Sequence, residues 1–228
     1  MASSSTAYKA YIAPFVIFVL LLGAIPLADS LAQKLHFSTN IGAQHWIFPL
    51  QTIVCAILLA AFWRKYELHW PQRIFFTLGI AALIFLIWIS PQIFFRAAPR
   101  REGFDPTLFE KNRALFLAVI AMRFARLVIV VPLVEEIFWR GFLLRYFIAE
   151  DFLRVPFGAY SRGSFAAVTL GFMFEHAMVD WPAAFCAGAL FNLVAYRTKN
   201  LGSCVLAHAA TNLLLGLFIL RTRQWGFW

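Results

Sequence analysis

The sequence has few charged residues. Only 14% of its 228 residues are Asp, Glu, Lys or Arg, whereas 62% are hydrophobic. An ordinary soluble domain has roughly 25% charged residues, and a disordered chain has few apolar ones. The three cysteines are too few for a disulfide-rich scaffold. This composition excludes those classes and predicts an all-α, polytopic membrane protein.

Acidic residues are especially scarce. The chain has 11 acids against 20 bases, a net charge of +9. Most bases lie between apolar stretches, where they contact lipid head groups, so we expect the lipid bilayer and not a nucleic acid as partner. The positive-inside rule favours a cytoplasmic position for residues 150–163 and 197–200. No connection is long enough for a soluble domain, so residues 1–228 are predicted to form one membrane domain.

The apolar stretches have the length of transmembrane helices, which need about 20 apolar residues. We expect such helices at 10–28, 47–63, 74–95, 164–180, 183–197 and 201–220. A longer tract at 114–149 is expected to divide at Pro132, because proline interrupts helical hydrogen bonding. The sequence thus predicts a bundle of seven or eight helices, seven if 114–131 does not cross. Residues 10–110 form N-terminal helices of unassigned role, and 114–220 form the core.

Polar side chains inside these stretches are the candidates for function. An ionisable group in a bilayer is costly, and its presence there suggests a functional site. The intramembrane polar residues are Glu135, Glu136, Arg140, Glu175, His176, Asn192, His208 and Asn212. They fall on four consecutive predicted helices, so a helical bundle can bring them together.

The spacing of the first group predicts a buried ion pair. Glu136 and Arg140 are four residues apart, so they lie on the same face of a helix. The pair would neutralise the Glu136 carboxylate and hold it rigidly. Glu135 is rotated by about 100° from Glu136, so it can point to a different neighbour.

The spacing of the later groups predicts a second polar face. His208 and Asn212 are four residues apart on one helix, as are Phe172 and His176 on another. A carboxylate, two imidazoles and a carboxamide supply a base and hydrogen-bond donors, which water activation and oxyanion stabilisation require.

Three motifs resemble those of a known family. The family is the CAAX protease and bacteriocin-processing family, CPBP. Its EExxxR motif is similar to EEIFWR (135–140), its FxxxH motif to FMFEH (172–176) and its HxxxN motif to HAATN (208–212). Members of this family are intramembrane proteases similar to the type II CAAX prenyl endopeptidase. The order and spacing of the motifs agree, and the resemblance covers residues 130–220.

The resemblance implies an endopeptidase in which glutamate activates water. The implied catalytic residues are Glu135, His176, His208 and Asn212. In this scheme the glutamate is the general base, His176 assists it, and the other two form the oxyanion site. The implied supporting residues are Glu136, Arg140 and Phe172.

Metal dependence is the main alternative within this mechanism. The sequence has no HExxH motif, so the arrangement of soluble zinc proteases is absent. We favour a mechanism without a metal or other cofactor. The alternative is a zinc ion held by Glu135, His176 and His208.

The expected substrate is a membrane-embedded or membrane-anchored protein or peptide. Two segments, VPLVEEIFWRGFLLRYFI and RQWGFW, also resemble the branch associated with bacterial exosortase systems. This resemblance implies an envelope protein-sorting context rather than prenyl-protein processing. We expect the protein in a bacterial inner membrane. The alternatives are a non-catalytic membrane scaffold or immunity protein and a proton-coupled transporter. The sequence assigns no role to Glu175, no prenylation to the substrate and no oligomeric state.

Overall fold

The computed structural model describes residues 2–36 and 41–228, and this part of the chain contains helices and no strand. The helices are α1 (Ala2–Lys34), α2 (Gln44–Phe62), α3 (Ile74–Phe94), α4 (Arg113–Phe124), α5 (Val131–Glu136), α6 (Leu144–Tyr146), α7 (Arg162–Glu175), α8 (Trp181–Thr198) and α9 (Leu201–Thr222). Six helices of the described part are long and apolar enough to cross a membrane. The predicted class, an all-α polytopic membrane protein, is confirmed.

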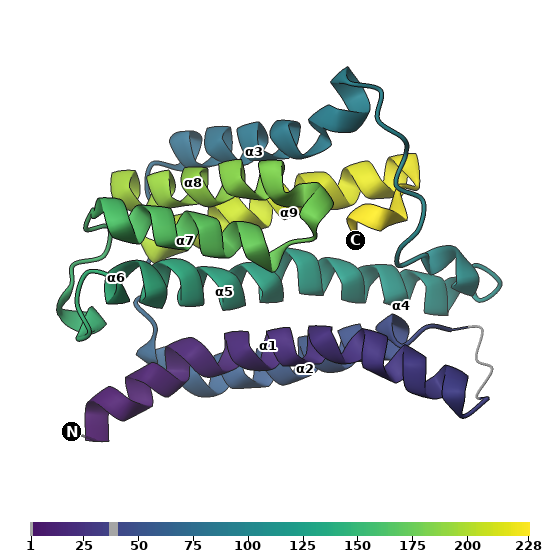
Figure 1. The fold of residues 1–228 in the computed structure, drawn as a ribbon, viewed down its shortest axis with the longest axis horizontal. Helices are drawn as coiled ribbons and strands as arrows, with labels where there is room; N and C mark the ends of the chain where they lie inside the picture. Colours follow the sequence, from purple (N-terminus) through teal and green to yellow (C-terminus); the bar gives the residue numbers. More distant parts are fainter. Residues whose placement is uncertain (1, 37–40) are drawn as a thin grey trace.

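Helices α4, α5 and α6 form one continuous helix, so the predicted division at Pro132 is wrong. The helix runs over Arg113–Tyr146, 34 residues, without a break (Figure 1). Two π-helical stretches, Ala125–Val130 and Ile137–Leu143, lie before and after α5. Pro132 follows the first of them, and a π-helical stretch is a common place for a helix to absorb an irregularity. With α7, which has 14 residues, the six long helices give a seven-helix bundle.

The helices form layers around this long helix. Helices α1 and α2 pair on one side of it, and α7, α8 and α9 lie on the other (Figure 1). Helix α3 packs on α8 and α9, and therefore joins the C-terminal helices. Gly141 allows α1 to approach closely, because a Cβ atom there would lie 2.9 Å from Cε1 of Tyr11.

Two arginines of the long helix are shielded inside the protein. The guanidinium of Arg123 lies 4.5 Å from the ring centroid of Phe48 and 4.6 Å from that of Phe104. Nε of Arg126 donates a hydrogen bond to Oε1 of Gln51 across 2.8 Å. These contacts remove both cations from lipid, which explains how a span can carry them.

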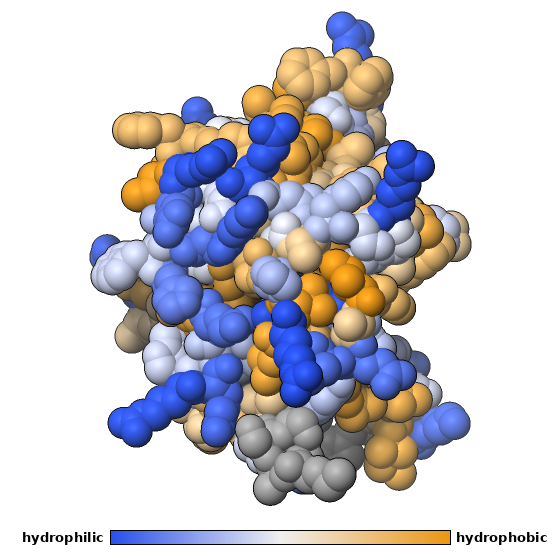
Figure 2. Space-filling model, turned by 90° about the vertical axis from the view of Figure 1, so that its left-hand side faces the viewer, coloured by the Kyte–Doolittle hydropathy of each residue, from blue (hydrophilic) through white to orange (hydrophobic). Residues whose placement is uncertain are grey.

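One end of the bundle carries the connections between α2 and α3, α6 and α7, and α8 and α9. Figure 2 shows hydrophilic side chains gathered on this end. Its exposed cations include Arg64, Lys65, Arg154, Arg197 and Lys199. Such a basic surface suits contact with lipid head groups. The cytoplasmic position of this end stays a prediction.

Candidate active site

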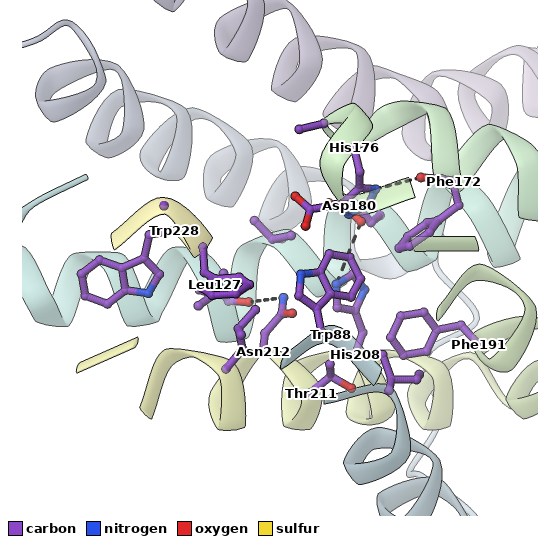
Figure 3. A pocket seen from close by; sticks show the side chains of 17 residues that line it. Trp88, Leu127, Phe172, His176, Asp180, Phe191, His208, Thr211, Asn212 and Trp228 are labelled. Atoms are coloured by element: carbon purple, nitrogen blue, oxygen red, sulfur yellow. Dashed lines mark hydrogen bonds and ion pairs between the residues drawn. The ribbon is translucent and has the colours of Figure 1, made fainter. Parts of the chain in front are cut away.

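A cavity of about 310 Å³ lies between α3, α5, α7, α8 and α9 (Figure 3). Its walls contain five residues from the three sequence motifs: Glu135, Phe172, His176, His208 and Asn212. Aromatic and aliphatic side chains form most of the remaining wall. The fold therefore brings four of the eight sequence-predicted polar residues to one apolar cavity, whereas Glu136, Arg140, Glu175 and Asn192 do not line it.

Glu135 supplies a carboxyl group with a free oxygen. The residue lies on α5 between the two π-helical stretches and is only 5% exposed. Its Oε2 has no hydrogen-bond partner within the described part of the chain. The nearest cationic candidate is Nε2 of His208, 4.0 Å away. This buried carboxyl oxygen is thus an acceptor without a partner on a residue of the cavity wall.

Glu136 has a different environment, because one oxygen of its carboxylate belongs to a buried network and the residue does not line the cavity. Its Oε2 has no hydrogen-bond partner in the described part of the chain. Oε1 accepts hydrogen bonds from Nη1 of Arg140 at 3.0 Å and from Nδ1 of His208 at 2.9 Å. Arg140 also donates to Oδ1 of Asn192 and to the Gly188 carbonyl, each at 3.1 Å. The ion pair expected from the i,i+4 spacing is present and has no exposed surface.

This network defines which nitrogen of His208 carries a hydrogen. A carboxylate paired with arginine accepts hydrogen bonds only, so Nδ1 of His208 must be the donor. In the neutral ring, Nε2 then carries a lone pair. Phe191 stacks on the same ring, with centroids 4.9 Å apart. The ring is therefore fixed in both position and tautomer.

His176 lies just beyond the end of α7. The predicted helix at 164–180 ends earlier, at Glu175, and His176 has an extended backbone. Its Nδ1 lies 2.8 Å from the Phe172 carbonyl oxygen, one of the carbonyls that a helix C-terminus leaves without an N–H partner (Figure 3). Nδ1 is thus the donor, and Nε2 is left for the cavity. Trp181 anchors this residue by donating to its carbonyl at 3.1 Å.

Asn212 faces the cavity from α9. Its Nδ2 donates a hydrogen bond to the Leu127 carbonyl on the long helix, at 2.9 Å (Figure 3). This contact distinguishes the amide nitrogen from the amide oxygen, because a carbonyl accepts only from a donor. One of the two N–H bonds remains for another partner.

Two tryptophans that sequence reasoning did not single out contact residues of the motifs. The ring of Trp88, on α3, lies 5.3 Å from that of His176. Nε1 of Trp139 donates to Oε2 of Glu175 at 2.9 Å. No pattern in the sequence points to Trp88, since α3 resembles any apolar span. Trp139 is signalled only by its place inside the first motif.

The mouth of the cavity is formed by segments that are distant in the sequence. Asp180 lines it and forms an ion pair with Arg100 across 2.6 Å. Gly226, Phe227 and Trp228 line it as well, and the Gly226 N–H donates to the Arg100 carbonyl at 2.9 Å. The connection between α3 and α4 and the residues after α9 therefore close one side of the site together.

The sequence offered Glu135, His176 and His208 as alternative ligands of a zinc ion. Across residues 2–36 and 41–228, no three His, Cys, Asp or Glu side chains lie close enough to hold one metal ion. Glu135, His176 and His208 share the cavity without forming such a group. The three cysteines are free.

The fold and the cavity define a multi-pass membrane protein with a polar site inside an apolar bundle. Residues 113–214 match the family model described as type II CAAX prenyl endopeptidase Rce1-like. The matched range contains all three motifs and amounts to slightly less than half of the chain. The resemblance to the CAAX protease and bacteriocin-processing family is thus confirmed, and the matched region is that of a membrane protease family. No curated protein and no solved structure matches the chain.

Proposed function

We propose that this protein is an intramembrane endopeptidase that cleaves a membrane-associated protein or peptide with glutamate-activated water. The observation that carries the proposal is the arrangement of Glu135. Glu135 lines a cavity that also contains both motif histidines and Asn212, and its carboxyl group keeps one acceptor without a partner. Glu136, the adjacent carboxylate, pairs with Arg140 and does not line the cavity, so we assign the base to Glu135.

In the proposed reaction, Glu135 takes a proton from water while the water oxygen attacks the substrate carbonyl carbon. Nε2 of His176 accepts the second hydrogen bond of that water and orients it. The protonated Glu135 then gives its proton to the leaving amide nitrogen as the C–N bond breaks. The products are a carboxylic acid and an amine, and the glutamate returns to its initial state.

The oxyanion is assigned to Asn212 and His208. The free N–H of Asn212 can donate to the developing negative charge. His208 presents a lone pair at Nε2 in its neutral state, so it donates only after it binds a proton. We therefore assign His208 a contribution only when both of its ring nitrogens carry a hydrogen, whereas Asn212 donates throughout.

The substrate is proposed from the membrane setting of the site. We expect a protein or peptide that is embedded in or anchored to the bilayer, prenylated or not, in a bacterial inner membrane. The resemblance to the exosortase-associated branch stays a prediction. The oligomeric state is not part of the proposal.

A proteomic comparison tests the function and finds the substrate together. Membrane and secreted fractions are compared between cells with the wild-type protein and cells with the Glu135→Gln variant. Loss of the general base should reduce cleavage by about 10²–10⁴-fold while membrane insertion persists. Glu110→Gln, at an exposed connection, is the matched control and should cleave normally. Wild-type cleavage by the Glu135→Gln protein would overturn the proposal, and proton-coupled flux without cleavage would favour the transporter.

A further inference from the structure

We propose that Pro132 is a positioning residue, because its missing backbone N–H leaves the Leu127 carbonyl free to hold the carboxamide of Asn212. Its effect on catalysis rests on the proposed function of Asn212. The hydrogen bond between Asn212 and the Leu127 carbonyl does not depend on the proposed function and can be tested alone.

The first step concerns the hydrogen-bond register of the long helix. In a π-helix, such as the stretch Ala125–Val130, N–H groups bond to carbonyls five residues earlier. At the end of this stretch, the N–H of Val131 bonds to the Arg126 carbonyl. In the same register, the next carbonyl, that of Leu127, would accept from the N–H of residue 132.

The second step is the identity of residue 132. Proline has no backbone N–H, so the helix cannot use the Leu127 carbonyl in this register. Pro132 is buried, and an unpaired carbonyl away from water is costly. Another donor is therefore required, and Nδ2 of Asn212 supplies it at 2.9 Å.

The third step links this contact to the cavity. Leu127, Glu135 and Asn212 all line it, so the bond between Leu127 and Asn212 lies in the cavity wall. With one N–H held by Leu127, the carboxamide cannot rotate freely, and its second N–H keeps one direction. A donor fixed in this way needs no reorganisation during the reaction.

Pro132→Ala tests the inference, because alanine restores the N–H and is the best helix former. The restored N–H should compete for the Leu127 carbonyl and release Asn212. The direct readout is the side-chain amide resonance of Asn212 in ¹⁵N-asparagine-labelled protein, assigned by its loss in Asn212→Ala. We expect this resonance to move toward the position of an unbonded amide. Pro26→Ala, an exposed proline inside α1, should leave it unchanged.

The kinetic readout uses a fluorogenic farnesylated CAAX peptide in liposomes. Pro132→Ala should lower kcat roughly tenfold to hundredfold with KM within about twofold of wild type. In an Asn212→Ala background, the same change should alter kcat by less than about twofold, because Pro132 acts through Asn212. A purely structural role of the proline would give multiplied losses.

The two readouts separate the possible failures. An Asn212 resonance that Pro132→Ala does not move overturns the inference, whatever the activity. Multiplied losses in the double variant overturn the positioning role. Failure of the wild-type protein to cleave any substrate counts against the proposed function alone, because the resonance then still reports on the arrangement.

Discussion

Nδ1 of His208 lies 2.9 Å from Oε1 of Glu136, so a single hydrogen bond joins the first motif of the chain to the last. The same oxygen accepts a hydrogen bond from Nη1 of Arg140. The ion pair predicted from sequence thus also orients the histidine of another helix. Changes at Glu136 should therefore affect both the stability of the bundle and the geometry of the cavity.

Glu136→Gln should strongly destabilise the protein. The substitution leaves the fully buried Arg140 without a counter-charge, which typically costs about 3–5 kcal/mol. The free energy of unfolding in mixed micelles measures this loss. Asp151→Asn is the control, because its ion pair with Arg154 is exposed and should contribute less than about 1 kcal/mol. Equal effects of the two substitutions would contradict the structural role of Glu136.

Trp139→Phe should destabilise the protein through Glu175. The indole is the donor to Oε2 of Glu175, whose Oε1 has no partner in the described structure. Loss of the donor should cost about 1–3 kcal/mol, measured by the same unfolding assay. In a Glu175→Leu background the cost of Trp139→Phe should be smaller, because no carboxyl is then left unpaired. Trp63→Phe, at a half-exposed tryptophan, controls for the loss of an indole.

Gly202→Ala should destabilise the protein by forcing the start of α9 away from the connection that precedes α3. A Cβ atom at this position would lie 2.1 Å from the His69 carbonyl oxygen, so one backbone must move. We expect a loss of about 1–3 kcal/mol, as for other overpacked sites. At Gly79 no atom lies within 4 Å of such a Cβ. Gly79→Ala should therefore cause no loss of thermal stability. An equal loss in both variants would show that the loss in Gly202→Ala does not come from the contact with His69.

Trp88→Ala should lower activity without altering insertion into the membrane. The substitution removes the ring that packs against His176, so the imidazole gains freedom in the cavity. Displacement of a catalytic group by about 1 Å can reduce kcat about tenfold to hundredfold. Steady-state kinetics with the identified substrate measures the effect. Leu83→Ala, on the exposed side of α3, should retain wild-type kcat.

Removal of divalent metals should leave activity intact. Within the described structure no three potential ligands are close enough to share an ion. The purified protein should cleave its substrate after chelation and dialysis. Stoichiometric zinc that restores a lost activity would contradict the glutamate mechanism.

Much of the fold was predictable because hydrophobic length is a direct physical signal. The spans at 47–63 and 74–95 agree with α2 and α3 within a few residues, since a membrane helix must satisfy its own backbone. The i,i+4 spacing of Glu136 and Arg140 was enough to predict their ion pair. In these cases the information is local in the sequence.

The errors concern features that depend on tertiary contacts. Proline usually breaks a helix, but at Pro132 the π-helical register and the Asn212 side chain compensate for the missing N–H. The early end of α7 at Glu175 depends on the contacts of His176 with Phe172 and Trp181. Trp88 reaches the site only because α3 packs on α8 and α9. Single-sequence spacing carries no signal for such long-range packing.

The length of the central helix has a consequence for the membrane itself. Its 34 residues extend about 51 Å at 1.5 Å per residue, whereas the hydrocarbon core is about 30 Å thick. A rigid rod of this length must tilt or project from the bilayer, and its tilt depends on bilayer thickness. Because this helix carries Glu135 and packs on α7 and α9, these helices tilt with it. The depth of the site in the bilayer should therefore depend on the length of the surrounding acyl chains.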